Sequence, residues 1–110
     1  MPPLRLSLTI ALCWLVSAAC AQTVDLAAAE ATLQKNKCGK CHSVDKKKDG
    51  PSFKETAAKY RSKADAHQQL TRHLTTGPTI KIDGIEEQHV VLKTGDEPER
   101  ANLLRFILSR

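Results

Sequence analysis

The stretch Cys38-Gly39-Lys40-Cys41-His42 is the most specific short arrangement in this chain of 110 residues. It has the form C-x-x-C-H, which is typical of covalent haem attachment. Two thiols three positions apart can each add to one vinyl group of a porphyrin, and the histidine that follows is then placed to bind the iron. The motif therefore predicts one covalently attached haem c, with Cys38 and Cys41 as attachment points and His42 as an iron ligand.

Two other interpretations of the cysteine pair are a thioredoxin-like redox pair and one half of a zinc site. A redox pair is expected near a βαβ pattern, and a zinc site needs a second pair of ligands at suitable spacing. The sequence downstream of His42 shows neither pattern. Haem attachment is the interpretation that the context favours.

Haem c is normally attached outside the cytoplasm, so the chain should carry an export signal. Residues 1–21 contain one positive charge, an apolar run over residues 6–16 and the small-residue pattern Ala19-Cys20-Ala21. This arrangement predicts a secretory signal peptide that is cleaved before Gln22. The expected organisation is a signal peptide over 1–21 and one domain over 22–110, located in the periplasm.

Two alternatives for the N-terminal segment stay open. A retained membrane anchor is one, although the apolar run is well short of the ~20 residues that span a bilayer, and we expect no stable membrane insertion. Lipid attachment at Cys20 is the other, although Ser17 stands where such a signal usually has a large aliphatic residue.

Cleavage before Gln22 would change the composition of the protein. It would remove two of the four cysteines together with the only methionine and the only tryptophan. The remaining 89 residues carry 16 basic and 12 acidic side chains, a net charge of +4 without the haem. A chain of this size is near the lower limit for an unassisted hydrophobic core, and a haem would supply a large apolar body. Because no aromatic residues interleave the basic ones, nucleic acid is not an expected partner.

Helical patterns occur in four places in the mature sequence. The first runs from the cap residue Asp25 to about Asn36, with an apolar stripe at Leu26, Ala29 and Leu33. Three further starts have capping-box spacing at Ser52/Glu55, Asp65/Gln68 and Asp96/Glu99. The apolar faces of these helices are Phe53, Ala57 and Tyr60; Ala66, Leu70 and Leu74; and Leu103, Leu104, Ile107 and Leu108.

A segment of another kind lies between the third and fourth helices. Thr79–Ile82 and Ile85–Leu92 are rich in β-branched residues and flank Asp83-Gly84, which predicts a small hairpin with a two-residue turn. In that register Ile82 faces Ile85 and Ile80 faces Glu87. His89 would then share a side with the three isoleucines, an apolar wall suited to a haem face, although Glu87 on the same side has no explanation at this stage.

Several stretches resemble the small bacterial class I c-type cytochromes, and the resemblance covers nearly all of residues 22–110. The residues that carry it are Lys35-Asn36-Lys37, the C-x-x-C-H motif, Gly50 to Lys54, Ala57 to Tyr60 and Leu103 to Ser109. It implies an all-α cytochrome c fold of about four short helices around one haem, with the first and last helices crossing beside it. It also implies that Pro51 offers its backbone carbonyl to His42 and so belongs to the cofactor-binding residues.

The sequence departs from this family at the second axial ligand of the iron. Most class I cytochromes place a methionine in the loop before the final helix, and residues 22–110 contain no methionine. His89 stands in that loop and is the predicted second iron ligand. His67 and His73 lie on the third predicted helix, where a histidine is more often a solvated surface residue. They remain alternatives, as does an iron that is open or bound by water.

With two histidine ligands the iron would have no vacant site, so the expected function is one-electron transfer at a lowered potential. The protein is expected to be an electron carrier and not an enzyme, and to be a monomer that docks transiently with redox proteins. The lysine run Lys46–Lys48 is either a solvated loop or part of a docking surface. Alternatives are a weakly ligated iron that binds small gases, and a cytochrome subunit of an exported dehydrogenase.

Overall fold

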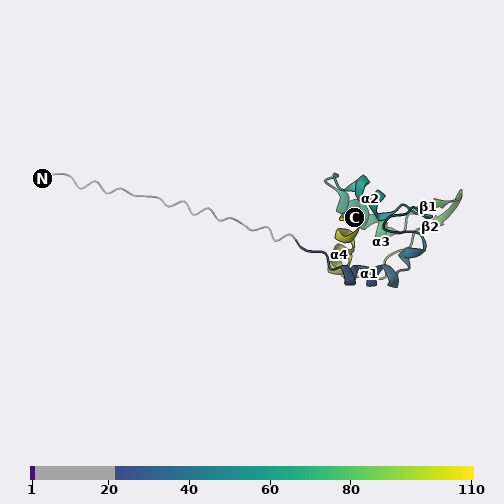
Figure 1. Ribbon diagram of the computed structural model, residues 1–110, viewed down its shortest axis with the longest axis horizontal. Helices are drawn as coiled ribbons and strands as arrows, with labels where there is room; N and C mark the ends of the chain where they lie inside the picture. The colour runs from purple at the N-terminus through teal and green to yellow at the C-terminus, as the bar shows by residue number, and fades with distance from the viewer. Residues whose placement is uncertain (2–21) are drawn as a thin grey trace.

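The computed structural model describes Met1 and residues 22–110 (Figure 1). The predicted signal peptide over residues 1–21 therefore lies, apart from Met1, outside the described residues. The described elements, in chain order, are α1 (Leu26–Lys35), the 3-10 turn η1 (Cys38–Lys40), α2 (Phe53–Tyr60), α3 (Ala66–Thr76), β1 (Thr79–Ile82), β2 (Ile85–Gln88) and α4 (Glu97–Leu108). This is the predicted set of four short helices with one hairpin. None of these helices is long and apolar enough to cross a membrane.

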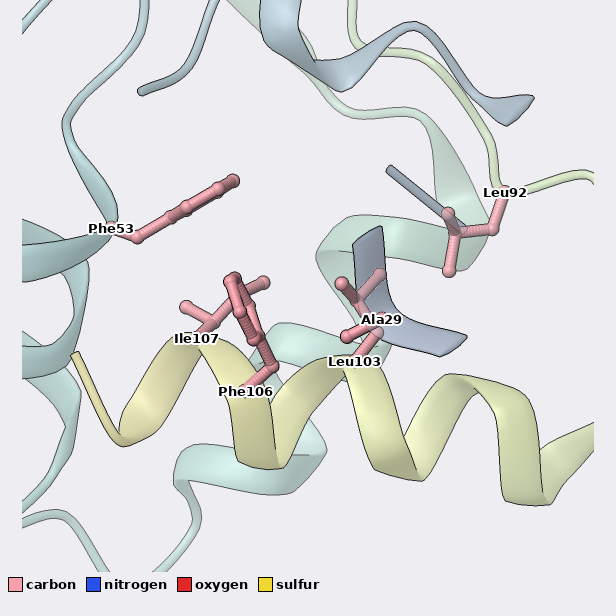
Figure 2. Packing of buried hydrophobic residues seen from close by; sticks show 6 residues of the cluster. All are labelled: Ala29, Phe53, Leu92, Leu103, Phe106 and Ile107. Atoms are coloured by element: carbon pink, nitrogen blue, oxygen red, sulfur yellow. The ribbon is translucent and has the colours of Figure 1, made fainter. Parts of the chain in front are cut away.

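Helix α4 packs against both α1 and α2, although α1 and α4 lie at opposite ends of the domain sequence. Ala29 of α1 and Leu103 of α4 are completely buried where the helices meet (Figure 2). The small side chain of Ala29 allows the two backbones to approach closely. Full burial of a leucine stabilises the folded state by about 1.5–3 kcal/mol, so this contact contributes substantially in a domain of this size.

Two aromatic rings extend the core from α4 to α2. Phe53 and Phe106 meet edge to face, with ring centroids 6.2 Å apart, and both side chains are buried. Leu92 and Ile107 complete the cluster that Figure 2 shows. The predicted apolar stripe of α1 is wrong at one position, because Leu26 is 52% exposed. Thr32 is buried in the same helix because its hydroxyl is hydrogen-bonded.

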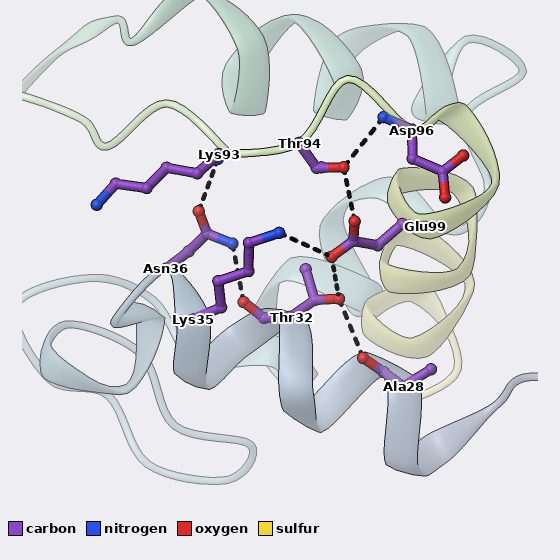
Figure 3. A network of polar contacts seen from close by, with 8 residues as sticks. All are labelled: Ala28, Thr32, Lys35, Asn36, Lys93, Thr94, Asp96 and Glu99. Carbon is purple, nitrogen blue, oxygen red and sulfur yellow. Dashed lines mark hydrogen bonds and ion pairs between the residues drawn. The ribbon is translucent and has the colours of Figure 1, made fainter.

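Polar contacts tie α1 to α4 beside this core. The side chain of Asn102 accepts from the amide of Asp25 and donates to its carbonyl, each at 2.9 Å. On the next turns Thr32 Oγ1 donates to Glu99 at 2.9 Å, and Asn36 Oδ1 accepts from the amide of Lys93 at 2.7 Å (Figure 3). The predicted packing of the first helix against the last is therefore confirmed, and it rests on polar as well as apolar contacts.

Two of the predicted helix caps form and two do not. Asp25 accepts from the amide of Ala28 at 3.0 Å, and Ser52 and Glu55 form a complete capping box. At the start of α4 the capping box is absent because Thr94 Oγ1 already binds the amide of Asp96 that Glu99 would have taken. Glu99 instead accepts from the hydroxyls of Thr94 and Thr32.

The predicted box at Asp65 is also wrong. Asp65 has a φ of −101° and a ψ of 18°, whereas a capping residue usually has an extended backbone that brings its side chain onto the first amides of the helix. Its carboxylate binds the side chain of Gln69 at 2.8 Å instead. The helix still begins and ends where the sequence indicates, with Gly77 as a left-handed C-terminal residue.

The hairpin has the predicted turn and register, with Ile82 opposite Ile85 and Ile80 opposite Glu87. Its second strand is shorter than predicted and ends at Gln88, just before His89. Ile80 and Ile82 of β1 are half-buried, whereas every residue of β2 is exposed and Ile85 is 65% exposed. The predicted apolar wall is thus confined to β1. Glu87 is accommodated because it lies on this exposed strand.

Candidate haem-attachment site

The two cysteines of the motif lie on the tight turn that follows α1. Lys37 adopts a left-handed conformation with a φ of 55° and redirects the chain into η1. The amides of Cys41 and His42 then both bind the carbonyl of Cys38, at 3.2 and 3.0 Å. Cys38 and Cys41 are free thiols and half-buried, and burial raises the pKa of Cys38. The turn brings two cysteines and a histidine together within five residues.

A hydrogen bond to the protein backbone fixes the orientation of the His42 ring. Its Nδ1 lies 2.7 Å from the carbonyl oxygen of Pro51, the contact that the sequence resemblance implied. A carbonyl can only accept, so Nδ1 carries the proton and Nε2 keeps a free lone pair. The ring also stacks on Phe53 of the core, with centroids 5.5 Å apart and planes 18° apart.

Gly50 also belongs to the site, although the sequence analysis named it only among the residues that carry the family resemblance. A Cβ at this position would lie 2.5 Å from Cε1 of His42 and 2.9 Å from its Nδ1. Its amide binds the carbonyl of Cys41 at 2.8 Å, which holds the loop against the motif. Only a residue without a side chain lets Pro51 reach His42, and the position of this glycine directly before Pro51 is the signal that could have found it.

His89 faces His42 from the segment that follows the hairpin. The two ring centroids are 6.1 Å apart, with an angle of 55° between the planes. His89 Nδ1 lies 2.8 Å from the carbonyl of Val90 and therefore carries its proton, which leaves Nε2 of this histidine free as well. The ring is half-buried, and burial lowers the pKa of His89.

The predicted position of His73 was wrong. It was expected on the solvated surface of α3, but it is half-buried and its ring centroid lies 4.1 Å from that of His89. Burial, followed by the charges of His89 and His42, lowers the pKa of His73 to about 4, so its imidazole is neutral at pH 7. His67 is exposed on the same helix, as expected. Helical spacing alone could not distinguish the two.

The spacing of the two facing histidines fits a haem iron between them. Metal–imidazole bonds are about 2.0–2.1 Å long, so two imidazoles that both bound one iron would have their ring centres roughly 6 Å apart. The observed 6.1 Å meets this requirement. The donor set fits as well, because each imidazole presents an unprotonated nitrogen and the two thiols are free.

A C-x-x-C-H turn whose histidine is oriented by a backbone carbonyl, in a fold of four short helices, defines a c-type haem protein. The chain belongs to the cytochrome c family, whose model matches residues 27–110. Members of this family carry covalently attached haem c, and this chain binds one such group.

Solved structures and curated relatives agree with this family. The class 1 cytochrome MtoD of Sideroxydans lithotrophicus ES-1 is 46% identical, with a TM-score of 0.75, over 79% of this chain and 97% of that one. Cytochrome c552 of Nitrosomonas europaea is 26% identical, with a TM-score of 0.56, over 73% of this chain and 96% of that one. Cytochrome c-551 of Pseudomonas denitrificans is 48% identical over 40 residues, which are 36% of this chain and 49% of that protein. The chain thus spans about half the length of the curated relatives that it matches.

Proposed function

We propose that the protein is a one-electron carrier whose haem iron is bound by His42 and His89 and is low-spin in both oxidation states. The observation that supports this most directly is the 6.1 Å separation of the two imidazoles. The hydrogen bonds of both Nδ1 atoms to backbone carbonyls support it further, because they leave Nε2 as the coordinating atom of each ring. An iron with two firm nitrogen ligands has no open position for a substrate.

The haem supplies a one-electron change between ferric and ferrous iron. The residues of this chain determine how easily that change occurs. Cys38 and Cys41 hold the group covalently, and Pro51 orients His42 and raises the basicity of its imidazole through their hydrogen bond. Imidazole in place of a methionine thioether favours the ferric state, so the potential should lie below that of methionine-ligated relatives.

The proposal includes the place where the protein works. Residues 1–21 direct export and are removed, and the folded domain acts in the periplasm, where haem c is attached. The start of the family match at residue 27 is consistent with a leader that precedes the domain. Donors and acceptors are redox proteins that dock transiently with a monomer, and the exposed Lys46 and Lys47 next to the haem motif contribute positive charge to that encounter.

The test is the spin state of the purified holoprotein, measured by absorption and paramagnetic resonance spectroscopy. We expect a low-spin bis-histidine signature in the wild type and its loss in His89→Ala. His67→Ala is the matched control and should leave the signature unchanged, because His67 is exposed. A low-spin spectrum that persists in His89→Ala would contradict the ligand assignment.

A high-spin wild type would instead indicate an iron with an open position. Binding of carbon monoxide or nitric oxide would then become the leading function, because only an open iron admits such ligands.

A further inference from the structure

The segment that carries His89 is held against the C-terminal end of α3. The amide of His89 donates to the carbonyl of Pro78 at 2.9 Å, and the amide of Leu92 donates to the carbonyl of Leu74 at 2.9 Å. The hairpin before this segment gives little support of its own, since β2 is exposed along its length. The end of α3 and the residues that follow it therefore support the segment of His89.

Gly77 lies at the point of closest approach between the two segments. It is buried and left-handed, with a φ of 59°, and a Cβ there would lie 2.9 Å from both the carbonyl oxygen of His89 and Cγ2 of Val91. The backbone of His89 can occupy its position only because residue 77 has no side chain.

His73 lies one helical turn before Gly77, and residues four apart share a face of a helix. Its ring is in contact with the ring of His89, at a centroid distance of 4.1 Å and an angle of 53°. This is a packing contact between the two rings. Leu70 and Leu74 anchor the same helix. Leu70 is buried, and Leu74 packs against the core.

We propose that His73 and Gly77 are positioning residues for His89. The glycine lets the backbone of His89 approach α3, and the imidazole of His73 limits the orientations that the ring of His89 can take. This inference rests on the proposed function, in which His89 binds the iron. It adds that the strength of that ligand bond depends on one face of α3.

The first experiment compares Gly77→Ala with Gly84→Ala. Both glycines are left-handed, with φ values of 59° and 81°, but a Cβ at Gly84 would meet nothing within 4 Å. Both variants therefore carry comparable backbone strain, and only the first displaces His89. The readout is the rate at which carbon monoxide binds the ferrous holoprotein, which is limited by release of the axial ligand. We expect Gly77→Ala to bind at least about tenfold faster than wild type and Gly84→Ala within about twofold. Equal rates in the two variants would overturn the role of Gly77.

The second experiment compares His73→Ala with His73→Phe. Loss of the ring should speed carbon monoxide binding severalfold and shift the low-spin resonance, whereas phenylalanine, which keeps a ring in contact with His89, should restore both values toward wild type. Wild-type behaviour of His73→Ala would overturn the positioning role of His73. A high spin state in both His73→Ala and His73→Phe would also overturn it, because phenylalanine cannot bind iron and His73 would then be the ligand itself.

Failure of the inference is distinguishable from failure of the proposed function. If His89→Ala keeps the low-spin spectrum, the proposed ligand and the positioning role are both wrong. If His89→Ala loses it while the Gly77 and His73 variants match wild type, His89 is the ligand and only the positioning role is wrong.

Discussion

The two sides of the haem site are built in different ways. On the His42 side the supporting contacts described above come from residues close in sequence: Pro51 holds the ring, Gly50 makes room for it and Phe53 joins it to the core. On the His89 side the support comes from α3, across a hairpin whose second strand is exposed. The first side is a local structure that Phe53 joins to the core, and the second brings α3 together with the segment that follows the hairpin. We expect the two sides to respond differently to substitution.

The largest difference should appear when one apolar side chain is removed from each side. Phe53 is 7% exposed and Ile85 is 65% exposed. Phe53→Ala should lower the free energy of unfolding by about 3–5 kcal/mol, because it leaves a cavity between His42 and Phe106. Ile85→Ala should change it by less than about 0.5 kcal/mol. Denaturant unfolding of the two holoproteins checks this, and equal losses would mean that the hairpin also belongs to the core.

The next effect in size concerns the glycine beside His42. Gly50→Ala places a methyl group on the His42 ring and should cost about 1–3 kcal/mol of stability as the loop moves away. It should also weaken the hydrogen bond that His42 donates to the carbonyl of Pro51, which would be visible as a shift of the reduction potential. Gly39 is the matched control within the motif, since a Cβ there meets nothing within 4 Å. Comparable losses of stability in Gly50→Ala and Gly39→Ala would contradict the steric explanation.

A smaller effect should depend on pH. It concerns the hydrogen bonds of Glu99, which join the segment after His89 to helices α1 and α4. Hydrogen bonds from Thr94 and Thr32 hold the pKa of Glu99 below its usual 4.5. A carboxyl group whose pKa is lower in the folded state contributes stability that is present above pH 4.5 and is lost as the pH falls through the folded value. The chain just after His89 should therefore loosen in acid.

Unfolding measured between pH 6 and 3 checks this effect. Glu99→Gln should flatten the acid limb of the stability profile, while Glu97→Gln, at an exposed residue for which no side-chain hydrogen bond is described, should not. Identical profiles for Glu99→Gln and the wild type would rule out a role for the Glu99 carboxylate.

The smallest effect on the fold should come from the lysines of the loop after His42. Lys46→Glu/Lys47→Glu should leave stability nearly unchanged but slow electron exchange with an acidic redox protein severalfold at low salt. The difference should vanish at high salt because the charges are screened. Lys81→Glu on the exposed hairpin is the control for the other side. A similar slowing in both variants would show that docking does not favour the His42 side.

The same contrast explains how much of the molecule was predictable from sequence. The helix positions, the hairpin register and the attachment turn follow from local patterns: a capping residue, a two-residue turn, a five-residue motif. The contact between Pro51 and His42 was implied by the family resemblance, and the role of Gly50 was missed. The capping box at Asp96 failed because Thr94, two residues earlier, binds the same amide. The contact between His73 and His89 could not be predicted from the sequence, because it depends on how α3 packs against the segment that follows the hairpin. Long-range packing decides such contacts, and local sequence does not record it.

The pairing of α1 with α4 has a consequence for how the protein is made. If the chain is exported N-terminus first, as proposed, the haem motif reaches the periplasm before Leu103, the residue that completes the core against Ala29. Until then the two thiols remain on an unfinished chain, where an attachment enzyme can reach them. The order of the helices thus provides a time window for cofactor loading that closes when the last helix docks.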